Sequence, residues 1–104
     1  MTQTASDWER QKVKDVATAI LTGQLSILEG TRALCPMAHT DAIAYEDDRR
    51  LVIGIESETD HLPVGEVRKL WRPDSLLEKD EEIARCEALW KDELLAVCRR
   101  ILEK

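Results

Sequence analysis

Apolar residues recur at helical spacing in the first third of the chain and predict two helices. Ser6 and Glu9 have the spacing of a capping box, in which each side chain accepts from the other residue's backbone N–H. The first helix is therefore expected to begin at Ser6, and Gly23 is a natural left-handed residue just beyond its end. A second helix over residues 24–34 would follow almost directly, so residues 1–35 are predicted to form a helical hairpin. The first apolar stripe consists of Val13, Val16, Ala17, Ile20 and Leu21.

Glycine in the second predicted helix indicates a close contact. Gly30 lies in the interior of this helix, where it costs about 1 kcal/mol relative to alanine. We therefore expect the two helices of the hairpin to approach closely at this position. Pro36 lacks an N–H and disfavours the helical conformation of Cys35, so the second helix is expected to end there.

The pattern changes between residues 40 and 62 and predicts a small β element. The runs 42–46 and 50–56 are expected to be two strands joined by an acidic turn at Asp47 and Asp48. The second run contains Leu51-Val52-Ile53, which is apolar and mostly β-branched and therefore favours a strand.

The helical period returns from residue 63 and continues to the end of the chain. A short amphipathic helix is expected before Pro73, and a long helix from Pro73 onward, with proline in its first turn. A helix of about 30 residues would reach about 45 Å, longer than a globule of this size is wide. It must therefore kink, project from the body or pack against a second copy. Its apolar stripe is Leu76, Ile83, Cys86, Trp90, Leu94, Val97 and Ile101.

Together these elements predict one domain, residues 1–104, that is mainly α with a small β element (α+β). Its parts are the helical hairpin (1–35), the β/turn segment (40–62) and the C-terminal helices (63–104). A chain of this length buries enough surface to fold without a metal or a disulfide, and no cofactor is expected.

Charge and composition exclude some classes of function. The 104 residues carry a net charge of −6, which argues against a nucleic-acid-binding protein, because neutralising phosphates requires a surplus of Lys and Arg. The same charge is compatible with a basic protein partner. No apolar run approaches the length of a membrane span, and the first 15 residues lack the features of a signal peptide. With three cysteines, an odd number, the chain is expected to be cytoplasmic.

Three acidic residues followed by a histidine form the candidate functional cluster. If the predicted strand continues, Glu56, Glu58 and Asp60 lie on one face about 6.6 Å apart, and His61 adds an imidazole. This set would suit Mn²⁺, Mg²⁺ or Zn²⁺ and would make a small metal-dependent enzyme. In the alternative interpretation, the acids are solvated or paired with cations such as Arg68, or Asp60 caps the helix that follows.

Two further patterns suggest sites. Cys35, Met37 and His39 form a C-x-M-x-H array of soft ligands that would suit Cu(I), although Cys and Met more often fill cores. Trp90 and Leu94 on the long helix are the candidate contacts of a homodimer.

Several short motifs resemble a group of small bacterial proteins known only as a domain family of unknown function. They are ILTG at 20–23, LEGTR at 28–32, SETDHLP at 57–63 with Gly65, and AVCRR at 96–100. The resemblance covers most of the chain and implies a stand-alone bacterial cytoplasmic protein, without an activity to transfer. Size and charge are also similar to those of toxin-immunity proteins, an analogy only.

The sequence therefore predicts a non-enzymatic cytoplasmic interaction protein with an acidic surface. The alternative is a small metal-dependent enzyme that uses the cluster at residues 56–61.

Overall fold

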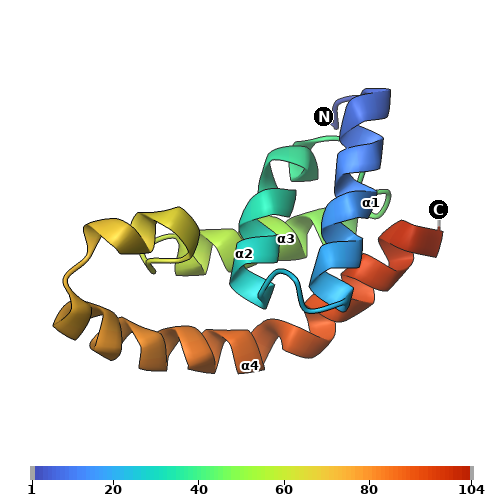
Figure 1. Ribbon diagram of the computed structural model, residues 1–104. Helices are drawn as coiled ribbons and strands as arrows, with labels where there is room; N and C mark the ends of the chain where they lie inside the picture. Colours follow the sequence, from blue (N-terminus) through green and yellow to red (C-terminus); the bar gives the residue numbers. More distant parts are fainter. Residues whose placement is uncertain (1, 104) are drawn as a thin grey trace.

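The computed structural model describes residues 2–103 and is built almost entirely from helices (Figure 1). In chain order the elements are α1 (Asp7–Leu21), α2 (Ile27–Leu34), the 3-10 helix η1 (Cys35–His39), α3 (Glu46–Thr59), the 3-10 helix η2 (Gly65–Leu70) and α4 (Pro73–Glu103). The prediction of a mainly α fold is confirmed.

The predicted helical hairpin is present, and its first helix begins at the predicted cap. The Ser6 hydroxyl accepts from the Glu9 backbone N–H at 3.1 Å, and the Glu9 carboxylate accepts from the Ser6 N–H at 2.9 Å. Gly23 follows the end of α1 with φ +82°, the left-handed conformation that favours glycine. The second helix starts three residues later than predicted, because Ser26 caps it by accepting from the Glu29 N–H at 3.1 Å.

Gly30 lies at the closest approach of α1 and α2, as the sequence predicts. A Cβ atom at this position would overlap Cδ1 and Cγ1 of Ile20, which is buried in the core. By contrast, Gly54 in α3 has open space around its Cα. A side chain therefore does not fit at Gly30, whereas one would fit at Gly54.

Replacing each helical glycine by alanine should change stability in opposite directions. We expect Gly30→Ala to lower the free energy of unfolding by about 1–2 kcal/mol, because overpacking against Ile20 outweighs the gain in helix propensity. Gly54→Ala, the matched control, should raise it by about 0.5–1 kcal/mol through helix propensity alone. Urea denaturation of the two variants measures both values. A stabilising Gly30→Ala would contradict the close contact.

The predicted β element is wrong. Residues 46–59, which include the predicted strand 50–56, form the helix α3, and residues 42–45 are turn and coil. Within residues 2–103 the only β pairing is an isolated parallel bridge between Gln3 and Thr40. The helix is favoured because one side chain in every three or four is buried, with three acidic residues in its first turn near the positive end of the helix dipole. The buried positions are Asp48, Val52, Ile55 and Thr59.

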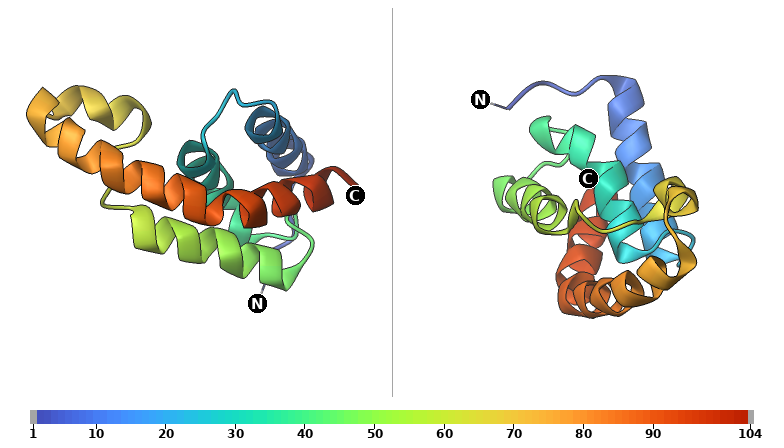
Figure 2. Two further views of the ribbon diagram at one scale, coloured as in Figure 1. Left: turned by 90° about the horizontal axis from the view of Figure 1, so that it is seen from below. Right: turned by 90° about the vertical axis from the view of Figure 1, so that its left-hand side faces the viewer.

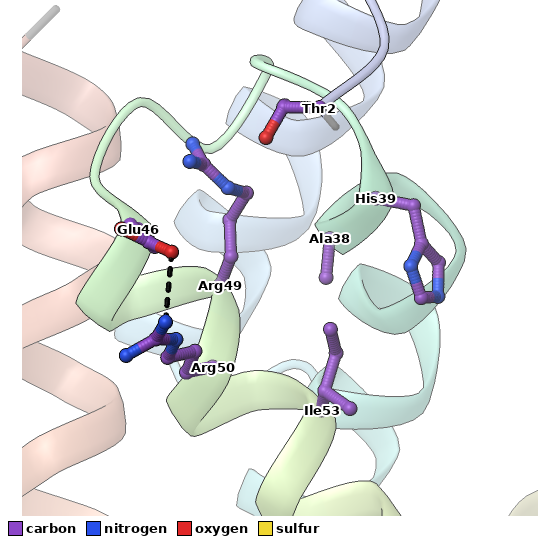
Figure 3. A pocket seen from close by; sticks show the side chains of 7 residues that line it. All are labelled: Thr2, Ala38, His39, Glu46, Arg49, Arg50 and Ile53. Atoms are coloured by element: carbon purple, nitrogen blue, oxygen red, sulfur yellow. Dashed lines mark hydrogen bonds and ion pairs between the residues drawn. The ribbon is translucent and has the colours of Figure 1, made fainter.

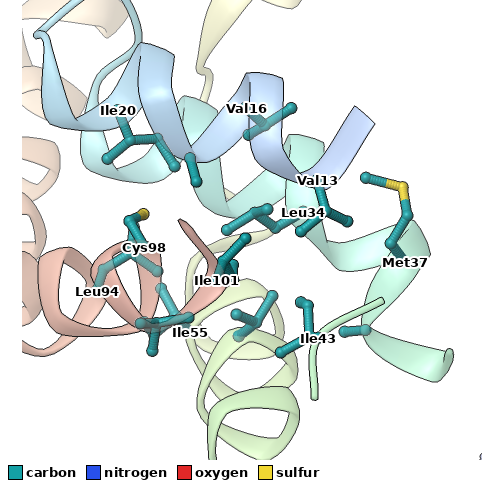
Figure 4. Packing of buried hydrophobic residues seen from close by; sticks show 14 of the residues in the cluster. Val13, Val16, Ile20, Leu34, Met37, Ile43, Ile55, Leu94, Cys98 and Ile101 are labelled. Atoms are coloured by element: carbon teal, nitrogen blue, oxygen red, sulfur yellow. The ribbon is translucent and has the colours of Figure 1, made fainter. Parts of the chain in front are cut away.

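The core lies where all four α-helices meet (Figure 4). It is mostly aliphatic, as expected for a chain without Phe, and α1, α2, α3 and the C-terminal part of α4 all contribute to it. The fully buried residues of α4 all lie near its C-terminal end: Leu94, Val97, Cys98 and Ile101.

The long C-terminal helix is confirmed, and its N-terminal part extends away from the core. The 31 residues of α4 correspond to about 46 Å of straight helix, slightly more than the longest of the molecular dimensions of 43 × 24 × 23 Å. Figures 1 and 2 show it running the length of the molecule, with η2 lying beside its first turns. We call residues 65–82 the arm, because this segment contains no fully buried side chain.

Candidate functional site

The acidic cluster lies at the end of a helix rather than on one face of a strand. At about 100° per residue, Glu58 points to the opposite side of α3 from Glu56 and Asp60. The interpretation of Glu56, Glu58 and Asp60 as three carboxylates on one face is therefore wrong. Asp60 is the C-cap residue of α3, and it makes no capping hydrogen bond to the segment that follows it within residues 2–103.

Glu56 is partly buried and lies beside an arginine that the sequence interpretation did not select. The Nε of Arg32 is 3.7 Å from Oε2 of Glu56, and neither atom has another partner among residues 2–103. The Nη2 of Arg32 donates to the carbonyl oxygens of Thr59 at 2.7 Å and Leu62 at 2.6 Å. Arg32 on α2 thus holds the end of α3 and the turn after it.

His61 and Arg68 connect the turn after α3 to the arm instead of joining a metal site. His61 Nε2 lies 2.9 Å from Glu82 Oε1, and this hydrogen bond lowers the pKa of Glu82 below its ordinary value. Arg68 contacts both carboxylate oxygens of Asp80, at 2.7 and 3.3 Å, and also donates to the Pro63 carbonyl at 3.2 Å. The hydrogen bond from Arg68 lowers the pKa of Asp80.

The predicted metal ligands do not converge. Among residues 2–103, no three His, Cys, Asp or Glu side chains are grouped so that they could hold a metal ion. The C-x-M-x-H array is also dispersed, because Met37 is buried in the core while His39 is exposed on the surface of η1.

A pocket of about 330 Å³ opens at the end of α3, and it contains two residues of the predicted cluster. We call it the α3-end pocket. Its wall combines apolar, aromatic and charged side chains from α2, the turn after α3, and η2. The lining residues are Arg32, Asp60, His61, Leu62, Pro63, Val67 and Trp71.

A second depression, of about 200 Å³, lies between η1 and the first turns of α3 (Figure 3). Its two arginines are already engaged. Arg49 donates to the carbonyl oxygens of Ile43 at 2.6 Å and Ala44 at 3.1 Å, and Arg50 pairs with Glu46 at 2.9 Å. These contacts fix the loop before α3 and the first turn of the helix.

The largest concentration of negative charge lies along α4. Residues 73–93 contain eight Asp or Glu and three Lys or Arg, so they carry −5 of the net charge of −6. Four of the acids occur at helical spacing on the solvent face, and none of their four carboxylates has an ion pair or hydrogen bond within residues 2–103. We call these four, Asp74, Glu78, Glu81 and Asp92, the acidic row.

Exposed leucines accompany the acidic row. Leu70, Leu77 and Leu89 are 84%, 71% and 66% exposed, among the highest values for large apolar side chains in the described chain. Leu77 and Leu89 are on α4 itself and flank the row, whereas Leu70 is the last residue of η2. The solvent face of α4 is therefore both acidic and locally apolar.

The residues predicted to form a dimer interface are not equally available. Leu94 is fully buried in the core of its own chain, so it cannot contact a second copy. Trp90 is partly buried and packs against the same core. The homodimer stays a prediction, and it would have to use other residues of α4.

Within residues 2–103, no helix has the length and apolar character needed to cross a bilayer. The resemblance to a family of unknown function rests on the quoted motifs, since no family model, no curated protein and no solved structure matches the chain.

Proposed function

We propose that this chain is a non-catalytic binding protein that engages a basic protein through the solvent face of α4. The observation that carries the proposal is the acidic row, which is exposed, aligned and not neutralised by the described part of the chain. A row from residue 74 to residue 92 extends about 27 Å along the helix, enough to follow an elongated basic surface.

The character of this face favours a protein partner. Rows of like charge steer oppositely charged partners, and the leucines beside the row offer apolar area that a contact would bury. Two copies meeting through this face would bring like charges together, which costs free energy. We therefore favour a basic partner over a second copy, and light scattering is the test of the homodimer.

We propose the cytoplasm as the place of action. The three cysteines are free thiols, and burial raises the pKa of the Cys98 thiol to about 11. Free cysteines persist in reducing compartments. An unreactive, buried thiol is a core residue rather than a redox group.

Removing three of the four charges of the acidic row should weaken the capture of basic proteins. The test variant carries Asp74→Asn, Glu78→Gln and Glu81→Gln. We expect wild-type protein immobilised on a resin to retain basic proteins from an extract of the source cells, identified by mass spectrometry. For a purified partner, calorimetry should show that the variant binds at least about tenfold more weakly than the wild type. The affinity of the wild type should fall as the salt concentration increases.

A matched control distinguishes the effect of the acidic row on binding from the effect of the net charge. Asp15→Asn, Asp47→Asn and Glu103→Gln change the charge by the same amount at exposed positions away from the row. The control should bind like the wild type. Equal losses in both variants, or no basic protein retained by the wild type, would contradict the proposal.

A further inference from the structure

We propose that the α3-end pocket is a subsite for one arginine side chain of the partner. This inference rests on the proposed function, because it takes the occupant from a basic protein. It adds a place where a single residue of that protein is recognised, on a part of the surface that the acidic row does not include.

The pocket offers apolar and aromatic surface to a side chain. Leu62 and Pro63 are buried residues of the turn after α3, so this wall is held in place by the core. Val67 and Trp71 approach from η2 and its end, and both keep part of their surface accessible. The methylene stem of a long basic side chain can pack on such a wall while its charged end stays at the rim.

The charged groups of the pocket leave one uncompensated carboxylate. Arg32 is engaged with two carbonyl oxygens, and Glu56 at 3.7 Å offsets its charge. His61 is held by Glu82 at 2.9 Å. Asp60 is exposed, and its carboxylate has no hydrogen bond or ion pair with any residue between 2 and 103.

The backbone adds to the attraction for a cation. Asp60 lies at the C-terminal end of α3, where the helix dipole places partial negative charge. The last turn of this 14-residue helix contains no basic residue of its own, and Arg32 of α2 offsets part of the negative charge by donating to the Thr59 carbonyl at 2.7 Å. A cation entering the pocket would therefore meet the carboxylate of Asp60 first, together with the part of the helix-end charge that Arg32 does not offset.

Trp71 distinguishes among cations. The indole face attracts cations, and a planar guanidinium both stacks on it and forms a paired hydrogen bond to a carboxylate. An ammonium lacks this planar geometry. The combination of Trp71 and Asp60 thus favours arginine over lysine, and both over a neutral side chain of the same shape.

Nuclear magnetic resonance can test the subsite without a known partner. The full chain is labelled with ¹⁵N and titrated with N-acetyl-arginine amide, with its neutral analogue N-acetyl-citrulline amide, and with N-acetyl-glutamate amide. The three indole N–H signals are distinguished by a Trp71→Phe variant. We expect the arginine probe to shift the Trp71 signal with a dissociation constant on the order of millimolar, and the other two probes to leave it unchanged.

Two aspartate variants locate the charge. Asp60→Asn should weaken the arginine probe about fivefold, whereas Asp92→Asn, an exposed acid of the row, should leave its affinity unchanged. Stronger binding of the glutamate probe would show that Arg32 dominates the pocket and would overturn the proposal. Equal shifts with arginine and citrulline, or an unaltered affinity in Asp60→Asn, would also overturn it.

The outcomes for the subsite and for the proposed function can be told apart. If the acidic-row variant loses basic proteins while the arginine probe fails to shift Trp71, the function stands and the subsite is wrong. If the probe binds at Trp71 but no basic protein is retained by the wild type, the subsite stands as a guanidinium site and the proposed partner is wrong.

Discussion

Replacing Arg100 with leucine should lower the free energy of unfolding by about 2–3 kcal/mol, because it leaves a buried carboxylate without its partner. Asp48 in the first turn of α3 is 5% exposed, and both its oxygens accept from Arg100, with Nη2–Oδ1 at 2.7 Å and Nε–Oδ2 at 2.9 Å. We place the effect below that of breaking a fully buried pair because the Arg100 side chain remains 42% exposed. Urea denaturation gives the value.

The neighbouring arginine provides the control for this experiment. Arg99 is exposed and has no ion pair within residues 2–103, so Arg99→Leu should change stability by less than about 0.5 kcal/mol. The double variant Asp48→Leu with Arg100→Leu should recover part of the loss, because it removes the buried charge along with its partner. If the double variant is less stable than Arg100→Leu alone, the loss comes from packing and not from the unpaired carboxylate.

Replacing Arg32 with methionine should lower the free energy of unfolding by about 2–3 kcal/mol, an effect similar to that at Arg100. The substitution keeps most of the stem but removes the guanidinium, which leaves the Leu62 carbonyl and the Glu56 carboxylate without their partner. The Thr59 carbonyl loses one of its two donors and keeps the Leu62 N–H. We expect faster hydrogen exchange to accompany the loss, chiefly in the segment from the end of α3 to the arm.

A surface arginine serves as the matched control. Arg50 pairs with Glu46 on the exposed face of α3, and Arg50→Met should cost less than about 0.5 kcal/mol. Lysine at position 32 should restore little, because a single ammonium cannot reproduce the planar fork of a guanidinium. A fully stable Arg32→Met would show that the end of α3 is held by its apolar contacts alone.

The sequence predicts the terminal elements of the fold well because their signals are local. A capping box, a left-handed glycine and a proline in the first turn each depend on residues a few positions apart, and they bound α1 and the start of α4 correctly. The close contact at Gly30 was also predictable, since an interior glycine in a helix requires a compensating reason.

The central helix was missed because short apolar runs are ambiguous between strand and buried helix. The β-branched residues around Ile53 favoured a strand, but the spacing of residues 48, 52, 55 and 59 already had the helical period. Counting Asp48 and Thr59 as core positions would have revealed it, yet polar residues are seldom assigned to a core.

The candidate site was only partly predictable for a different reason. Asp60 and His61 do line a pocket, and Arg32 lines it too. Arg32 is 27 and 30 positions away in the sequence from the two residues whose carbonyls it binds. The pair of Asp48 and Arg100 spans 52 positions. Such pairs are set by how the helices pack, and no local spacing in one sequence identifies them.

Under the proposed function, the arm separates binding from folding, two requirements that most surfaces of a small protein meet with the same residues. Since residues 65–82 place no side chain fully inside the core, we expect substitutions there to leave the packing of the core intact. Under the proposed function, a lineage could therefore change which protein is bound while keeping the same folded body, and an engineer could graft a new binding segment at the same position. The N-terminal part of α4 is thus open to exchange, whereas its C-terminal part is fixed by the core.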